Sequence, residues 1–414
     1  MLMKVIKNTF LRIMVNAPTI TFNAIRRRLR KRAERGLIWL KELCDNVRQG
    51  FLWNKCDVCG MEMAKPLFCG KEVCNVCGKT HSQAHKRRFD RWWYKCLFLF
   101  EKYGKMRYIV ITLPTELCLE LSVLPPWERR KLLKDFRRYV KRKLDRLFGK
   151  KEWVGKMRYH WAGDKGYFHP HLNIIIAGRW VEKPDLKKLR VDCARWWKNK
   201  GFAVPKEFVI HTQYIKTIPL LRHKVKYITR PTMNLIDDTK FEKEFNSYLE
   251  RMSQSLQFLE GKILTIWEKV GVFLLVLLRD LYKEQFRLLF DKWFWWYDVV
   301  DGFRNDIEFG WTREIQAQYK VWLYKREEML DTLIEQEYSI LDNLQDVEGL
   351  EDLSCFEIRR LETELRRIRL MLGLCPFCGA KLGKWEYWQG NVEILEAQGW
   401  FFDEDLGILY KDTS

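Results

Sequence analysis

Two histidines and an asparagine alternate along one apolar segment of the sequence. Phe168–Ile176 reads Phe-His-Pro-His-Leu-Asn-Ile-Ile-Ile. Side chains two residues apart on a strand point to the same face, so His169, His171 and Asn173 share one face and the residues between them face a core. Imidazole nitrogens and an amide oxygen gathered in this way are suitable ligands for a divalent metal ion.

A third imidazole is predicted to join them from the preceding strand. Trp153–Trp161 is followed by the turn sequence Gly-Asp-Lys-Gly at 163–166, which is typical of a hairpin. A turn centred on its Asp-Lys pair places His160 opposite His169, about 5 Å away between Cβ atoms. The alternative is a group of surface histidines on a half-solvated sheet. Because three of the seven histidines lie in this hairpin, we favour a site for Mn²⁺ or Mg²⁺, which would also accept zinc in vitro.

A tyrosine near this hairpin is a candidate nucleophile. The helix predicted over Leu220–Arg230 places His223, Tyr227 and Arg230 together beside its apolar stripe. A free phenol has a pKa of about 10, and neighbouring positive charge lowers that pKa and favours attack on phosphorus. The alternative is a tyrosine that fills the seam between sheet and helix. Tyr214 is the reserve candidate.

Five cysteines in residues 51–90 predict a zinc module. The two pairs Cys56-x2-Cys59 and Cys74-x2-Cys77 are separated by fourteen residues, which approximates a four-thiolate zinc site. The reserve ligands for an alternative or second ion are Cys69, His81 and His85.

Another pair, Cys375-x2-Cys378, resembles half of a zinc ribbon. No further pair follows it, Cys355 is a poor candidate partner, and another chain could complete the site. The remaining cysteines lie in apolar or amphipathic surroundings and are predicted to be packed thiols: Cys44, Cys96, Cys118 and Cys193.

The elements that must position these residues alternate between strands and helices. Strands are predicted at Tyr108–Leu113, Trp153–Trp161, Phe168–Ala177 and Glu207–Gln213, and helices at Glu128–Phe148, Asp185–Lys200 and from Pro219 to before Pro231. The order β-α-β-β-α-β-α indicates an α+β fold with one antiparallel sheet and packed helices, the ferredoxin-like arrangement, rather than a doubly wound parallel fold.

The chain divides into five predicted segments. They are a basic helical arm (1–50), a zinc module (51–104), an α+β domain that carries the histidine and tyrosine candidates (105–235), a helical domain (236–372) and a Cys-pair with an acidic tail (373–414). Helices are expected at 241–260, 262–296, 313–344 and 356–372.

The composition and net charge of the chain limit the classes of binding partner that we expect. The chain has 414 residues, of which 47% are hydrophobic and 31% charged, and a formal net charge of +21. These values exclude general disorder and a polytopic membrane protein, and they make nucleic acid the first partner to test, before an anionic membrane surface. The longest apolar run, Gly271–Leu278, is too short to span a bilayer and no secretory signal is evident, so a cytoplasmic location is expected. The predicted DNA contacts are Arg27, Arg30, Arg87, Arg88, Arg137, Arg138, Lys141 and Arg142.

Three of these segments resemble, in order and spacing, the motifs of HUH endonucleases, the superfamily of rolling-circle replication initiators of plasmids and viruses and of related single-strand transposases. They are Tyr108–Thr115, the His-Pro-His-Leu-Asn stretch from His169, and Lys226–Pro231. The likeness covers about 105–233. In that superfamily two histidines around one hydrophobic residue hold the ion, and Asn173 departs from this pattern at the second position. His160 corresponds to a third ligand.

The resemblance implies a function. It implies metal-dependent nicking and rejoining of single-stranded DNA through a 5′-phosphotyrosine on Tyr227, at a replication origin, with a host polymerase or helicase as a possible partner. A single-strand transposase is the near alternative. A zinc-containing DNA-binding protein without catalysis is the alternative from another class, and Asn173 is the main argument for it. The oligomeric state is left open.

Overall fold

The computed structural model describes most of the chain outside the N-terminal arm and one long central segment. The described residues are 42–69, 74, 77, 82–104, 106–122, 124, 126–149, 153–162, 168–178, 182–202, 204–230, 305–343, 350–390 and 392–411. Arg27, Arg30 and the helices predicted at 241–260 and 262–296 lie outside them. The chain forms two compact units, one of residues 1–40 with 71–310 and one of 41–70 with 311–414, a division that differs from the five consecutive segments predicted above.

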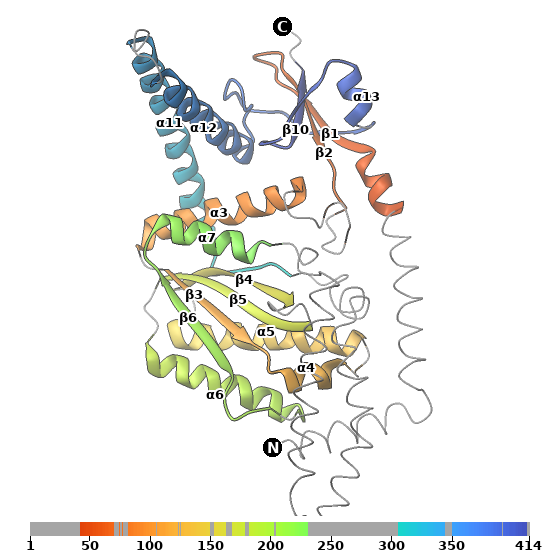
Figure 1. Cartoon of the computed structure of the whole chain (residues 1–414), viewed down its shortest axis with the longest axis vertical. Coiled ribbons are helices and arrows are strands. Elements are labelled where there is room, and N and C mark those ends of the chain that lie inside the picture. The colour runs from red at the N-terminus through yellow and green to blue at the C-terminus, as the bar shows by residue number, and fades with distance from the viewer. Residues whose placement is uncertain are drawn as a thin grey trace, which may run out of the picture. The chain divides into compact units, whose positions relative to one another are not determined.

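The first unit is built on a five-stranded antiparallel sheet with helices on both faces (Figure 1). Its strands are β3 (Met106–Thr112), β4 (Trp153–Ala162), β5 (Phe168–Gly178), β6 (Val209–Ile215) and β7 (Ile307–Phe309), in the order β6-β3-β5-β4-β7. Its helices are α3 (Gln83–Tyr103), α4 (Thr115–Ser122), α5 (Pro126–Phe148), α6 (Lys183–Asn199) and α7 (Ile218–Ile228).

The two faces of this sheet contact different helices. Tyr159 and His160 are neighbours on β4 and therefore point to opposite faces. The hydroxyl of Tyr159 donates to the carbonyl of Leu133 on α5, whereas His160 contacts the carbonyl of Ile228 on α7. Hence α5 and α6 cover one face, and α3 and α7 pack on the other (Figure 1).

The face under α5 and α6 is the apolar core of the unit. Burying each such side chain contributes about 1.5–3 kcal/mol. The core residues include Ile109, Ile111, Leu172, Ile174 and Ile176 from the strands and Leu133, Phe136, Val140, Leu144, Leu189 and Trp197 from the helices, all at most 3% exposed.

The short strand β7 completes the sheet although it lies outside the predicted α+β domain, 105–235. Acidic side chains in β7 and at the residue before it neutralise two buried cations of β4, since Lys156 pairs with Glu308 at 3.1 Å and Arg158 pairs with Asp306. Gly155 on β4 allows β4 and β5 to lie close together at this point, because a Cβ atom there would lie 2.1 Å from a carbonyl oxygen of β5. A three-residue strand gives too little periodicity for sequence analysis to find it.

The second unit holds another five-stranded antiparallel sheet. Its strands are β1 (Gly50–Lys55), β2 (Glu62–Pro66), β8 (Glu386–Gln389), β9 (Phe401–Asp403) and β10 (Ile408–Lys411), in the order β8-β1-β2-β10-β9, and its helices are α11 (Arg313–Asn343), α12 (Leu350–Leu372) and α13 (Val392–Ala397). Ion pairs such as Arg326–Glu364 join α11 to α12. Residues predicted to be an acidic tail therefore complete a sheet with strands from the predicted zinc module.

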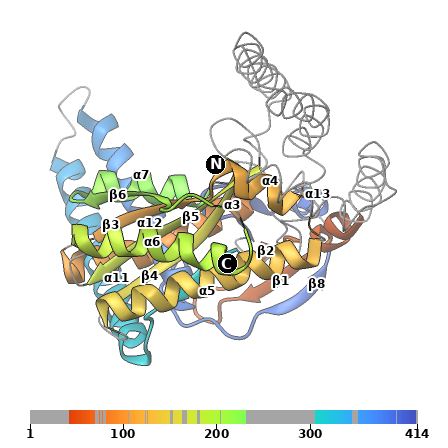
Figure 2. The same ribbon diagram turned by 90° about the horizontal axis from the view of Figure 1, so that it is seen from below.

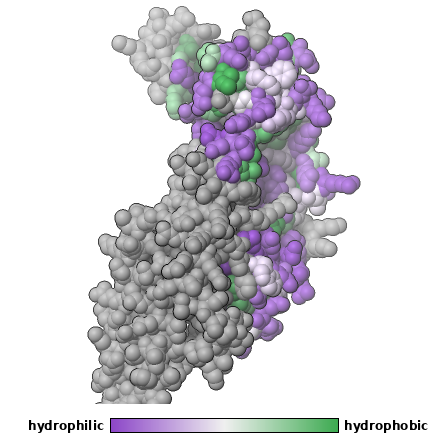
Figure 3. All heavy atoms as spheres, turned by 90° about the vertical axis from the view of Figure 1, so that its right-hand side faces the viewer, coloured by the Kyte–Doolittle hydropathy of each residue, from purple (hydrophilic) through white to green (hydrophobic). Residues whose placement is uncertain are grey.

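No helix within the described part of the chain is both long enough and apolar enough to cross a bilayer. On the face of the molecule drawn in Figure 3, most described residues are hydrophilic, and the hydrophobic ones form small patches.

Candidate metal centres and histidine site

The first cysteine group joins the two chain segments, 41–70 and 311–414, that form the second unit. Cys56 follows β1, Cys59 lies in the turn before β2, and Cys375 and Cys378 follow α12. The Sγ atoms of Cys56 and Cys378 are 3.6 Å apart, those of Cys59 and Cys375 are 3.7 Å apart, and all four lie within 4.8 Å of one another. Four sulfurs at about 2.3 Å from a tetrahedral zinc ion would be about 3.8 Å apart. This group, the ribbon cysteines, therefore has the geometry of a zinc site.

The two halves of the ribbon cysteine site use the same backbone turn. The N–H of Cys56 donates to the carbonyl of Met61 at 3.0 Å, and the N–H of Gly60 donates to the carbonyl of Cys56 at 2.9 Å. Cys375 and Gly379 make the equivalent two bonds. Both glycines have positive φ, 71° and 75°, a conformation that favours glycine. The sequence Cys-x2-Cys-Gly thus encodes a preformed turn twice.

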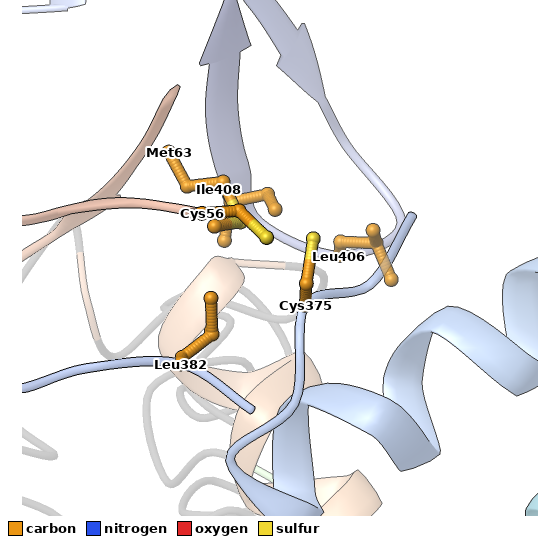
Figure 4. Packing of buried hydrophobic residues seen from close by; sticks show 6 residues of the cluster. All are labelled: Cys56, Met63, Cys375, Leu382, Leu406 and Ile408. Atoms are coloured by element: carbon orange, nitrogen blue, oxygen red, sulfur yellow. The ribbon is translucent and has the colours of Figure 1, made fainter. Parts of the chain in front are cut away.

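Apolar side chains surround the ribbon cysteines. Met63, Leu382 and Ile408 lie around the sulfurs of Cys56 and Cys375, which point toward each other (Figure 4). Burial acts against ionisation of Cys56, but hydrogen bonds from the backbone around it and from a neighbouring thiol lower its pKa to about 7. A thiol with a lowered pKa readily supplies the thiolate that a metal requires.

A second cysteine group contains Cys44, Cys69, Cys74 and Cys77, again with all four sulfurs within 4.8 Å. The N–H of Cys77 donates to the Sγ atom of Cys74 at 3.4 Å, and the hydroxyl of Ser82, which caps α3, donates to the carbonyl of Cys77. Each group can hold a structural metal ion such as zinc.

The sequence predicted the cysteine pairs correctly but predicted wrongly which pairs share a site. Cys56-x2-Cys59 and Cys74-x2-Cys77 do not share one site, because the first pair meets Cys375-x2-Cys378 and the second meets Cys44 and Cys69. Cys44 was predicted to be a packed thiol and is a candidate ligand instead. The pairs were recognisable from local spacing, but partners more than 300 residues away were not.

The histidines lie on the face of the first sheet that carries α3 and α7. His160 is opposite His171, not His169. The pairing nearest the turn, Ala162 with Phe168, is already one residue off the predicted register, and the irregularity between His160 and Ala162 adds a second residue. The rings of His169 and His171 are 4.7 Å apart between centroids. His211 on β6 shares this face and acts electrostatically on His171. We call His160, His169, His171 and His211 the histidine group.

Burial keeps the inner members of the histidine group neutral. It lowers the pKa of His171 to about 3, with a further contribution from repulsion by the other three imidazoles. Burial also lowers the pKa of His160 to about 4, against the opposing effect of the Ile228 carbonyl. Neutral imidazoles retain the lone pairs that bind metal ions.

Tyr227 lies beside this group. Its ring centroid is 4.8 Å from that of His160, and the guanidinium carbon of Arg230 is 5.0 Å from the ring. Nε2 of His160 contacts the carbonyl of Ile228 at 3.0 Å. Because a carbonyl only accepts, Nε2 carries the proton and Nδ1 keeps the lone pair. His223, one turn before Tyr227, is exposed.

The side chain of Asn173 is held inside the sheet by hydrogen bonds to protein groups. It is fully buried, its Oδ1 atom accepts a hydrogen bond from the hydroxyl of Tyr108, and its Nδ2 atom donates to the carbonyl of His171 at 3.2 Å. Burial raises the pKa of Tyr108, so this phenol remains a donor. The amide therefore braces the strand behind His171, and its oxygen already accepts one hydrogen bond.

Sequence analysis missed His211 and Tyr108. A single histidine on an edge strand gives no local signal, and only the strand register shows that it shares a face with His171. The register also places Tyr214 on the opposite face, where its ring stacks on Arg107 at 4.0 Å. Tyr214 is therefore a poor reserve nucleophile.

The predicted DNA contacts divide by exposure. Arg88 and Arg137 are only 9% and 5% exposed, and Arg137 donates to the carbonyl of Asn305, so these two side chains present little surface to a partner. Arg87 is partly buried, and burial with repulsion from a neighbouring arginine lowers its pKa to about 10. The other three lie toward the solvent side of α5: Arg138, which pairs with Asp135, Lys141, which pairs with Asp145, and Arg142.

Within the described residues, only the two cysteine groups bring three or more His, Cys, Asp or Glu ligand atoms within 4.8 Å of one another. The histidine group is more open than that. The sequence matches no protein-family model, and comparisons with curated proteins and with solved structures find no significant match.

Proposed function

We propose that this protein nicks and rejoins single-stranded DNA at the histidine group, with Tyr227 as the nucleophile. The observation that carries the proposal is the position of Tyr227, with its ring against His160 and under the cation of Arg230. The chain order β3-α-β4-β5-α6-β6 and the strand order β6-β3-β5-β4 support the ferredoxin-like arrangement that the resemblance to HUH endonucleases implies.

The residues present fit a divalent ion such as Mn²⁺ or Mg²⁺. His169 and His171 are adjacent, and Nδ1 of His171 is buried without a hydrogen-bond partner among the described residues. His160 Nδ1 and His211 are candidates for further ligands. An ion held there would withdraw electron density from a non-bridging oxygen of the scissile phosphate.

The remaining chemistry falls to the side chains. The Oη atom of Tyr227 forms a bond to phosphorus and the bond from phosphorus to the 3′ oxygen breaks, so the 3′ oxygen takes a proton and the 5′ phosphate stays on the tyrosine. Arg230 stabilises the phenolate as it forms. Because the phosphotyrosine retains the energy of the original bond, the reverse reaction rejoins the strand without a nucleotide cofactor.

The test is adduct formation by the full chain. We expect a 3′-labelled random single-stranded DNA pool with Mn²⁺ to give a band that survives denaturation, because the label stays on the tyrosine-bound fragment. Tyr227→Phe should abolish the band and Tyr214→Phe should retain it. A band that persists in Tyr227→Phe would overturn the proposed nucleophile. Nicking at one origin, as opposed to excision of element ends, separates an initiator from a transposase.

Two observations favour a second candidate, a zinc-containing DNA-binding protein without catalysis. The oxygen of Asn173 is engaged by Tyr108, and the histidine group is not closed around a single point. This candidate predicts DNA binding and no adduct from any tyrosine variant or from the wild type.

A further inference from the structure

The outer surface of α5 and α6 carries an unusual density of positive charge. Helix α5 contains ten Lys and Arg residues against three Asp and Glu, and α6 contains six against two. Two of these sixteen cations, Arg129 and Arg137, and one of the five acidic residues, Asp192, are buried. The accessible surface of the two helices therefore carries a net charge of +10, about half of the +21 of the whole chain. A surface so charged attracts polyanions strongly.

The two helices form one continuous surface. Tyr139 on α5 donates to the carbonyl of Asp192 on α6 at 3.2 Å, Lys143 pairs with Asp192 at 2.8 Å, and the rings of Phe136 and Trp196 are 5.4 Å apart. Figure 2 shows α5 and α6 side by side over the same face of the sheet.

Most of the acidic groups on these helices are already paired with cations. Asp135 pairs with Arg138, Asp145 with Lys141, and Asp192 with both Lys143 and Arg195. Exposed cations for which no ion pair is found within the described residues remain on both helices: Lys131, Arg142, Arg146, Lys183, Lys187, Lys188 and Lys198.

The surface offers phosphate contacts and few stacking platforms. Trp127 at the first turn of α5 is the large apolar side chain exposed on these two helices in the part of the chain that the structure describes. Single-strand binding surfaces alternate cations with exposed aromatic rings, and membrane-binding helices place apolar anchors beside their cations. A cation-rich surface with one exposed ring fits a duplex backbone better than either.

The surface is also separate from the proposed reaction site. Tyr159 contacts α5 and His160 contacts α7, so α5 and α6 lie on the opposite face of the sheet from Tyr227 and the histidine group. One segment of DNA cannot touch both faces without passing around the sheet. Helix α5, with 23 residues, is about 35 Å long, about one turn of duplex.

From these observations we propose that α5 and α6 form a binding surface for the backbone of double-stranded DNA, distinct from the single-strand site. The choice of DNA as the nucleic acid rests on the proposed function, whereas the preference for a duplex rests on the surface itself. The surface would hold the duplex that flanks the strand cut on the other face.

The test compares two variants with equal changes in charge. In the first, Arg142, Arg146, Lys187 and Lys188 are replaced by Gln in the full chain. Binding of a duplex of about 20 base pairs is measured by fluorescence anisotropy over a series of salt concentrations. We expect the Kd to rise about tenfold or more and the magnitude of the salt slope to fall by about 3–4, close to one for each cation that no longer neutralises a phosphate.

The matched control replaces four exposed cations of the second unit, Arg313, Lys325, Lys381 and Lys384, by Gln. It should bind duplex like the wild type. Equal weakening in both variants, or an unchanged Kd and slope in the first, would overturn the proposal, as would equal weakening for a single strand of the same length. Binding of phosphatidylserine vesicles through this surface, with duplex binding unchanged, would also overturn it.

Failure of this surface is distinguishable from failure of the proposed function. The first variant leaves Tyr227 and the histidine group unchanged, so it should still form the denaturation-resistant adduct on a short single strand. Loss of duplex binding with a retained adduct supports both proposals. A retained adduct without any change in duplex binding overturns only the surface.

Discussion

The cysteine groups and the histidine group each gather candidate metal ligands, but they differ in how completely they would surround an ion. Each cysteine group places four sulfurs within 4.8 Å, so a tetrahedral ion would have no position left for a substrate. The histidine group has adjacent imidazoles and a nearby phenol but is not closed around one point. A closed group stabilises a fold, whereas an open one leaves room for a phosphate. Ligand number and closure therefore separate the structural candidates from the reactive one.

The largest expected effect comes from opening the ribbon cysteine site. We expect wild-type protein to bind about two zinc ions per chain and Cys375→Ser about one, with the second unit losing cooperative unfolding. Zinc binding to structural sites is worth about 10–16 kcal/mol in small domains, more than a typical unit can lose. Zinc content and thermal unfolding check this.

Cys355→Ser is the matched control, since Cys355 lies on α12 outside both groups. It should retain both ions and the wild-type unfolding transition. If Cys375→Ser also retains two ions, the ribbon cysteines do not form a zinc site.

The elements of the fold that the sequence could predict are those that depend on local interactions. Strand β5 and helices α5, α6 and α7 were predicted to within about two residues, because amphipathic periodicity is a local property. The strands β7, β9 and β10 were missed, since strands of three or four residues form only when a neighbouring edge is present to pair with them. The α+β class followed from the first kind of element alone.

The candidate site also has some features that follow from local sequence pattern and others that depend on tertiary contacts. The shared face of His169 and His171 follows from strand alternation, whereas the position of His160 required the register shift in β4. Asn173 was predicted as a ligand because its face was correct, but only the packing reveals that Tyr108 occupies its oxygen. Local pattern gives the direction of a side chain, and tertiary contacts decide what it binds.

The next largest effect tests whether Asn173 braces the strand or binds an ion. Asn173→Ala leaves the buried hydroxyl of Tyr108 without its partner, which costs about 1–3 kcal/mol. We expect the free energy of unfolding to fall by about 2–3 kcal/mol in urea titrations, with Mn²⁺ affinity by calorimetry unchanged. Gln213→Ala, an exposed amide on the same face, should change neither. Unchanged stability with lost Mn²⁺ binding would make Asn173 a ligand.

A smaller effect should appear in the pH dependence of stability. The pKa of His160 is about 4 in the folded protein and about 6.5 when unfolded. Between these values the unfolded chain takes up a proton that the buried imidazole does not, so stability is fully present above pH 6.5 and is lost as the pH falls. This group alone should lower the free energy of unfolding by about 1 kcal/mol per pH unit in that window.

The variant His160→Gln lacks the titrating imidazole. Urea titrations at pH 6.5 and 5.5 should therefore show a smaller loss of the free energy of unfolding in this variant than in the wild type, by about the contribution of His160. His223→Gln changes an exposed imidazole and should keep the wild-type dependence. If His160→Gln and the wild type lose stability equally over this interval, His160 is not held neutral by burial.

The smallest effect probes the turn that the ribbon cysteine site uses twice. Gly379 has φ of 75°, and an alanine there would adopt the left-handed conformation at a cost of about 1–2 kcal/mol. Its Cβ atom would lie 3.3 Å from Nε of Arg369, a buried side chain that Glu327 and Asp331 hold by ion pairs and that would have to shift by a few tenths of an ångström. We therefore expect Gly379→Ala to weaken the second unit by about that amount in urea titrations and to retain both zinc ions. Gly383→Ala, with open space around its Cβ position, should be neutral. A loss of zinc in Gly379→Ala would mean that the turn sets ligand geometry as well as backbone stability.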